Sequence, residues 1–114
     1  MSEDSFSLYD LEIEVVHRDP TRRFVCKHGL GDVFRVRGST IEFPPGGSFG
    51  LYAMLAVLPF VPAKQRPTAA GDWMTSDAVI ACTDPHCGAG FRISRLAPKT
   101  YARAAHTAEP EPGA

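Results

Sequence analysis

Three cysteines and two histidines lie in two short segments of the chain, and these are the side chains best suited to chemistry. Cys26 and His28 are two positions apart, and the run from Cys82 to Cys87 adds two thiols and the imidazole of His86. Zinc and similar metals bind three or four Cys or His ligands that converge from separate segments. If the two segments meet, the pattern predicts a tetrahedral metal site formed by Cys26, His28, Cys82 and Cys87.

The chemistry of this predicted site has several alternatives. His86 can take the place of Cys87 as the fourth ligand. Four protein ligands would make a closed structural site, whereas three ligands and a water molecule would make a catalytic one. Without a metal, Cys26 and Cys82 would be ordinary buried side chains, since cysteine is among the most buried residue types. Cys82 and Cys87 would form a redox pair if their Cα atoms lay within about 7 Å.

The composition limits the classes of protein to consider. The 114 residues suffice for one domain, and the hydrophobic fraction of 44% and charged fraction of 22% are ordinary for a globular protein. The net charge of −1 argues against non-specific nucleic-acid binding. The acidic start at residues 1–5 does not resemble a secretory signal, and the apolar run 49–62 is shorter than the ~20 residues that cross a bilayer. We therefore expect a cytoplasmic protein with no nucleic-acid or membrane partner.

Hydrophobic alternation indicates the strands that would position the thiols. Tyr9, Leu11, Ile13 and Val15 alternate with acidic residues, which is typical of a strand covered on one face. Further strands are expected at 33–37, 77–82 and 91–96. We predict a single α+β domain over residues 1–97, with an antiparallel sheet of about four strands and one helix. Residues 98–114, rich in Ala, Pro, Glu and Gly, are expected to form a disordered tail.

The expected helix is unusual because it has no polar face. Ser48 is predicted as its N-cap, and the helix would run over 49–58 and end near Pro59. A helix that is apolar all round must be buried on every side or covered by a partner, and complete burial is hard in so small a domain. The pattern therefore predicts a subunit interface. The expected core is Leu11, Ile13, Val15, Phe34, Val36, Leu51, Leu55, Leu58, Val79, Phe91 and Ile93.

The order of these pieces resembles a family of small, roughly 90-residue bacterial and archaeal proteins of unassigned activity. That family has a Cys…His-x-x-Gly-Asp block, an apolar helix that begins near a cysteine, and a Cys-x-Asp-Pro block. Residues 28–34 match the first block, 46–47 and 51–59 the second, and 81–85 with 91–93 the third. Here the first cysteine is two residues before the histidine instead of four, the helix cysteine is missing, and Cys87 is extra. The resemblance implies a fold, and Cys87 would replace the lost ligand if the family binds a metal.

The sequence contains no P-loop and no dinucleotide-binding fingerprint. We therefore expect a non-catalytic accessory subunit or binding module, with zinc as a structural ion. Its partner would be a larger enzyme subunit or a second copy of the chain. The alternative is a small metal- or thiol-dependent enzyme that uses Cys26, His28, Cys82 and Cys87.

Overall fold

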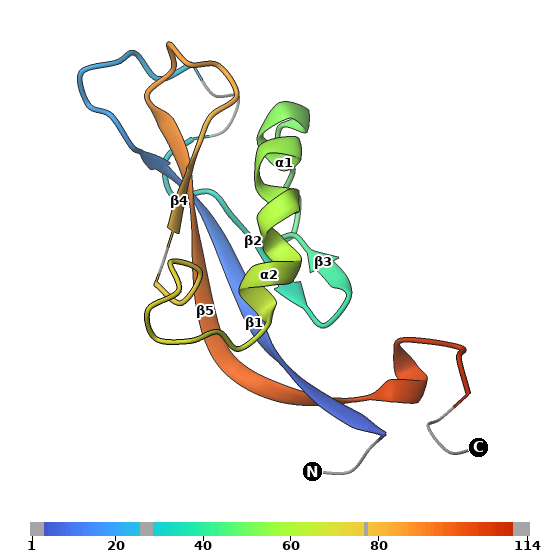
Figure 1. The fold of residues 1–114 in the computed structure, drawn as a ribbon. Coiled ribbons are helices and arrows are strands. Elements are labelled where there is room, and N and C mark those ends of the chain that lie inside the picture. The colour runs from blue at the N-terminus through green and yellow to red at the C-terminus, as the bar shows by residue number, and fades with distance from the viewer. Residues whose placement is uncertain (1–3, 26–28, 77, 111–114) are drawn as a thin grey trace.

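A computed structural model of the chain describes residues 4–25, 29–76 and 78–110. Its longest elements are two antiparallel strands, β1 (Ser5–His17) and β5 (Ala89–Ala102), which pair along most of their length (Figure 1). Three shorter strands join them: β2 (Val33–Arg37), β3 (Thr40–Glu42) and β4 (Ala78–Ala81). Within the described residues, the sheet has five antiparallel strands in the order β3-β2-β1-β5-β4. The predicted α+β class is confirmed, with one strand more than expected.

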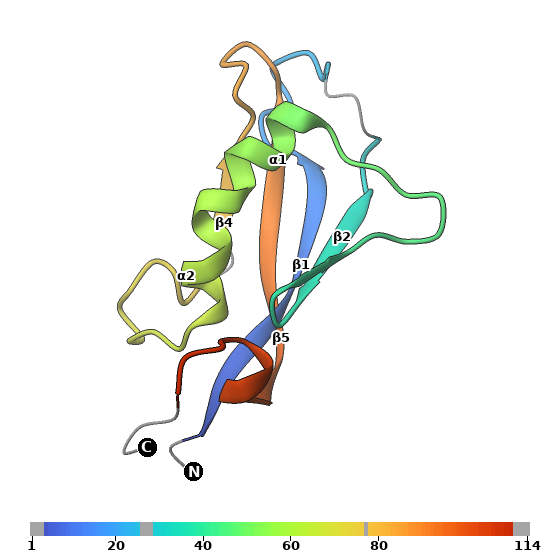
Figure 2. The ribbon, with the colours of Figure 1, turned by 90° about the vertical axis from the view of Figure 1, so that its right-hand side faces the viewer.

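One helical rod lies along a single face of this sheet, as Figures 1 and 2 show. It begins with α1 (Leu51–Val57), passes through the 3-10 turn η1 (Leu58–Phe60) and ends with α2 (Val61–Gln65). The three pieces follow one another without a break, so the helix spans 15 residues. Its length carries the chain from the cysteine end of the sheet toward the opposite end.

Both predicted ends of the helix were wrong. Gly50 rather than Ser48 occupies the N-cap position, and the helix passes Pro59 instead of stopping there. Pro59 and Pro62 each fall in the first turn of a new helical piece, η1 and α2 respectively. Each proline lacks the N–H for an i→i−4 hydrogen bond, and the change to 3-10 geometry at Leu58–Phe60 accommodates them within the rod.

The core lies between the helix and the sheet. Seven residues of the expected core are buried: Leu11, Ile13, Val15, Phe34, Val36, Phe91 and Ile93. The helix contributes Ala53, Val57 and Val61, which are spaced four residues apart and therefore share one face.

Three residues of the expected core are exposed instead: Leu51, Leu55 and Val79. Leu51 and Leu55 lie on the helix face that points away from the sheet, because Ala53, Val57 and Val61 occupy the other face. Val79 pairs with the exposed Arg92 on β5, whereas its neighbour Ile80 packs against the core. Leu58 is partly buried and packs against the core.

The face of the sheet opposite the helix carries charged residues. Glu12 pairs with Arg35 across β1 and β2 at 3.0 Å, and Glu14 pairs with Arg92 across β1 and β5 at 3.4 Å. All four side chains are at least partly exposed, so these ion pairs contribute little to stability. The alternation in the sequence thus predicted correctly that Glu12 and Glu14 would lie on the uncovered face of β1.

The pair formed by β1 and β5 extends further than the sequence indicated. It runs from His17↔Ala89 to Ser5↔Ala102, with a register shift between Tyr9 and Leu11. Pro98, where we expected the ordered domain to end, lies inside β5. Beyond Ile93, in the described residues, β5 pairs with β1 alone, so Pro98 lies in an edge segment of the sheet, where proline is tolerated.

Candidate functional site

The turn between β4 and β5 holds both described cysteines. Cys82 follows β4 and is half-buried, and its N–H donates to the Ala89 carbonyl oxygen at 3.2 Å. Cys87 is buried just before β5. Its Sγ accepts hydrogen bonds from the backbone N–H of Val25 at 3.3 Å and of Ala89 at 3.4 Å. The sulfur of Cys87 is therefore held by two backbone donors from different segments.

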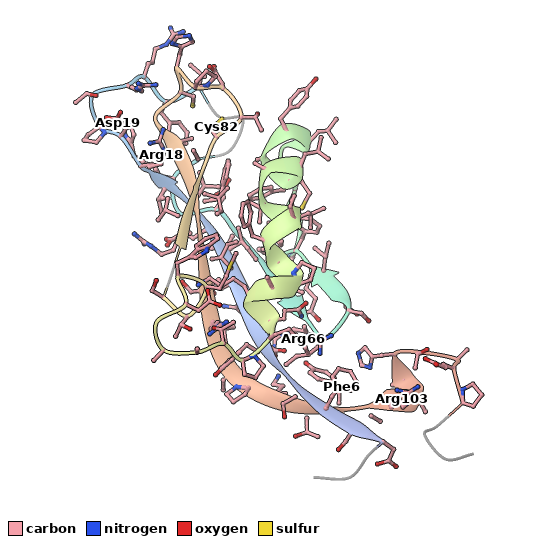
Figure 3. All side chains as sticks on the ribbon, in the orientation of Figure 1. Phe6, Arg18, Asp19, Arg66, Cys82 and Arg103 are labelled. Carbon is pink, nitrogen blue, oxygen red and sulfur yellow. The ribbon has the colours of Figure 1, made fainter. Side chains whose placement is uncertain are left out.

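The segment that leads to Cys26 lies directly against this turn. The Gly88 N–H donates to the Arg23 carbonyl oxygen at 2.9 Å, and the Arg22 guanidinium donates to the Pro85 carbonyl oxygen. A Cβ at Gly88 would lie 2.6 Å from the Arg22 carbonyl oxygen, so only glycine allows this approach. Figure 3 shows Arg18, Asp19 and Cys82 at this same end of the molecule. The two segments of the predicted metal site thus meet as far as Val25.

Cys26 and His28, the other two predicted ligands, lie outside the described residues. Among the residues that the structure does describe, no group of three or more His, Cys, Asp or Glu side chains is arranged to hold a metal ion. His86, the alternative ligand, is exposed, and its backbone N–H donates to Asp84 Oδ1 at 2.9 Å. The metal site therefore stays a prediction.

The hydrogen bonds to Cys87 bear on the chemistry that this turn can perform. Backbone N–H donors stabilise the negatively charged form of a thiol more than its neutral form. The thiolate is both the nucleophile and the metal ligand in cysteine chemistry. The two backbone donors therefore fix the position of the Cys87 sulfur beside the segment that ends at Val25.

A hollow of about 210 Å³ opens beside Cys82. It is lined by Cys82, Thr83 and Asp84, by Val25, and by the start of the helix at residues 50–53. Small-molecule pockets usually enclose about 300–1,000 Å³, so this hollow is small for a substrate. It has room for a side chain of another protein.

Three apolar side chains next to this hollow are exposed to solvent, and we call them the α1 patch. Leu51, Tyr52 and Leu55 are 69%, 70% and 57% exposed, respectively. No charged residue occurs between 49 and 63, so the patch has no polar flank along the helix. Contiguous exposed apolar residues of this kind mark interaction surfaces.

The C-terminal half of the same helix has the opposite character, which the sequence did not reveal. Lys64 and Gln65 are buried. Lys64 Nζ donates to the carbonyl oxygens of Met74, at 2.8 Å, and of Ser76, and Gln65 Nε2 donates to the Gly38 carbonyl oxygen at 2.7 Å. These hydrogen bonds attach the loop after the helix and the β2–β3 turn to α2, so both residues have a structural role.

A third buried polar residue that the sequence did not predict is Asp10. It belongs to the alternating acidic set of β1, yet it is only 1% exposed. Lys99 Nζ lies 2.8 Å and Arg37 Nη1 3.4 Å from Asp10 Oδ2, and the Tyr101 hydroxyl donates to Oδ1 at 2.7 Å. Burial raises the pKa of Asp10, but the hydrogen bonds from Lys99 and Tyr101 and the charges of Lys99 and Arg37 outweigh it and lower the pKa overall. The hydrogen bond to Asp10 in turn raises the pKa of Tyr101.

Lys99 and Tyr101 reach Asp10 because β5 continues past Pro98, so a strand that ended at Leu96 would have left this acid uncovered. The Asp10 cluster has a partner for each charge and no adjoining reactive group in the described residues. It stabilises the end of the β1–β5 pair and offers no catalytic arrangement.

The fold and this site together define a small α+β protein with a thiol-bearing turn and an apolar helix surface. No family model, no curated protein and no solved structure matches the chain. The family resemblance noted from the sequence motifs therefore stays a prediction. In the part of the chain that the structure describes, no helix is long and apolar enough to cross a membrane.

Proposed function

We propose that this protein is a non-catalytic accessory subunit or binding module of the cytoplasm that docks through the α1 patch. The observation that carries the proposal is the exposure of Leu51, Tyr52 and Leu55 side by side on one helix. Exposed leucine and tyrosine side chains at adjacent helix positions are unfavourable in water and favourable in a protein interface. The hollow beside Cys82 adjoins the patch and would receive a side chain of the partner.

The occupant that we propose for the α1 patch is a second copy of this chain. The helix carries no charge between residues 49 and 63, so two copies meet without like-charge repulsion. A two-fold axis would bring the same patch of each copy together, with Leu51 of one opposite Leu55 of the other. Three side chains supply only part of the ~800 Å² per partner of a standard interface, so we expect affinity in the micromolar range. A larger enzyme subunit is the alternative occupant.

Light scattering over a concentration series tests this proposal. The wild-type protein should change from monomer to dimer as its concentration rises through the micromolar range. Leu55→Glu should keep the protein monomeric, because it places a charge in the patch. Leu30→Glu is the matched control, since Leu30 is 61% exposed and Leu55 57%, and it should dimerise like the wild type. A wild-type protein that remains monomeric to millimolar concentration would contradict pairing through this patch.

The geometry at Cys87 favours a second candidate, a small metal- or thiol-dependent enzyme. Its sulfur accepts two backbone hydrogen bonds, one of them from Val25, the residue before Cys26. Elemental analysis and a melting curve with chelator test whether these thiols bind a metal at all. A closed structural zinc would be present at about one equivalent, and both chelator and Cys82→Ser would lower the melting temperature. Less than about a tenth of an equivalent, with melting indifferent to chelator, would reject the metal.

A further inference from the structure

A second hollow lies at the opposite end of the molecule from the cysteines. Its volume is about 290 Å³, and it is lined by Ser5, Phe6, Arg66, Arg103, His106 and Thr107. These residues come from the start of β1, from the residue after α2, and from the segment after β5 that includes η2 (Arg103–Ala105). Figure 3 shows Phe6, Arg66 and Arg103 together in this corner. The hollow thus combines two guanidinium groups, an imidazole and two hydroxyls.

Arg66 is available for an anionic ligand. Its guanidinium carbon lies 5.7 Å from the centre of the Phe6 ring, so the side chain is held over the aromatic face. In the described residues, no carboxylate forms an ion pair with Arg66. Its donors can therefore serve a ligand in the hollow.

Arg103 is less well satisfied than its ion pair suggests. Its Nη2 contacts Glu109 Oε2 at 3.2 Å and the Pro110 carbonyl oxygen at 3.2 Å. Its Nε is buried and has no hydrogen-bond partner among the residues that the structure describes. Because Nε is covered by protein, a ligand in the hollow would meet the Nη donors of Arg103, where Glu109 and Pro110 now contact Nη2. The Glu109 side chain is mostly exposed, and its pair with Arg103 is therefore weak.

The aromatic rings fix the remaining wall of the hollow. The His106 ring packs edge-on against Phe6 and Tyr101, with both ring centres 5.2 Å away. His106 Nδ1 lies 3.3 Å from the Ala102 carbonyl oxygen, which fixes the imidazole in place. Thr107 Oγ1 accepts the Glu109 N–H at 3.1 Å, so its hydroxyl hydrogen remains a donor.

We propose that this hollow binds a phosphate group between Arg66 and Arg103, and that Glu109 occupies the Arg103 donors when the phosphate is absent. Guanidinium groups recognise phosphate through paired, charge-assisted hydrogen bonds, and two of them line this hollow. A phosphate dianion brings more charge and more acceptor oxygens than the single carboxylate of Glu109, so it displaces that carboxylate. The group is inorganic phosphate or the phosphate of a monoester.

Titration of the full-length protein with inorganic phosphate tests this assignment, monitored by NMR chemical shifts at constant ionic strength with chloride as the reference anion. We expect millimolar affinity, with shifts centred on residues 5–6, 66 and 103–107. Arg66→Gln and Arg103→Gln should each weaken binding roughly five- to tenfold, and Glu109→Gln should strengthen it several-fold. Arg92→Gln, an exposed ion-paired arginine of the uncovered sheet face, is the control and should change nothing.

Parallel titration with glycerol phosphate distinguishes the two sources of the group. Tighter binding of the monoester would assign the hollow to an organic phosphate, and tighter binding of inorganic phosphate to the free ion. Shifts that chloride reproduces, or a loss in Arg92→Gln equal to that in Arg66→Gln, would overturn the proposal. Arg66 is exposed and makes no ion pair in the described part of the chain, so Arg66→Gln keeps the test valid even if Arg103→Gln fails to fold.

Discussion

The two halves of the helix treat polar and apolar side chains in opposite ways. In α1, Leu51, Tyr52 and Leu55 point into solvent, whereas in α2, Lys64 and Gln65 are buried. Whether a side chain of this helix is buried depends on the groups that surround its position, and not on how hydrophobic the side chain is. The polar side chains of α2 are bonded within the chain, whereas Leu51, Tyr52 and Leu55 of α1 are left exposed in the described part of the chain.

In the polar half, the side chains of Lys64 and Arg95 donate hydrogen bonds to backbone carbonyl oxygens that would otherwise lack donors. Lys64 serves the loop that follows the helix, and Arg95 donates to the carbonyl oxygens of Lys64 and Arg66 at 2.8 and 2.7 Å. Cationic groups at a helix C-terminus satisfy its last carbonyls and interact favourably with the helix dipole. The end of the helix is thus completed by the protein itself, while its beginning presents the α1 patch.

The largest expected effect comes from removing the buried cation in the polar half. Lys64→Met keeps the volume but leaves the Met74 and Ser76 carbonyls without their donor, which should lower the free energy of unfolding by about 2–4 kcal/mol. Urea denaturation followed by circular dichroism measures this difference. Arg35→Met, which removes an exposed ion pair with Glu12, is the control and should change the stability by less than about 1 kcal/mol. Equal losses in the two variants would mean that Lys64 contributes no more than a surface charge.

The contrast within the helix also shows what the sequence could predict. Alternation identified the core face of β1 and its partners Phe34, Phe91 and Ile93, because a strand has a fixed period of two. It did not place Leu51 or Leu55 correctly, because a helix that is apolar all round has no periodicity to orient it. Nor could it show that Lys64 is buried, since the loop carbonyls that bind it follow from tertiary structure.

The candidate site was predictable to a similar degree. The spacing of Cys82 and Cys87 indicated a thiol-bearing turn, and the structure places the segment ending at Val25 against that turn. The backbone donors to Cys87 could not be predicted, because they depend on how close Gly88 lets the two segments approach. The Arg66 and Arg103 hollow was also missed, since its residues lie far apart in the chain and form no motif.

A change at Asp10 should have an intermediate effect that depends on pH. The native pKa of Asp10 lies below its ordinary value of 3.8, so the ionised form is favoured by folding. Its contribution is present above the unfolded pKa and is lost as the pH falls through the native pKa. At pH 7, Asp10→Asn should lower the free energy of unfolding by about 1–2 kcal/mol, a modest value because Lys99 and Arg37 are partly exposed.

Denaturation curves from neutral pH down to about pH 2 check this prediction. The wild-type protein should lose more stability than Asp10→Asn below about pH 4, so the gap between them should close in acid. Glu14→Gln serves as the control, because Glu14 makes an exposed pair with Arg92. A gap that stays constant with pH would show that the charge of Asp10 does not stabilise the fold.

The smallest effect on stability is expected in the apolar half, where an exposed and a buried residue of the same helix can be compared. Val57 is buried against the sheet and Leu55 is exposed, although both lie in α1. At a protein concentration low enough for the monomer, Leu55→Ala should change the free energy of unfolding by less than about 0.5 kcal/mol, whereas Val57→Ala should lower it by about 2 kcal/mol. A loss in Leu55→Ala as large as that in Val57→Ala would mean that Leu55 is covered within the fold. A near-zero loss, with dimer formation weakened at high concentration, would identify Leu55 as a residue whose apolar surface is used between molecules.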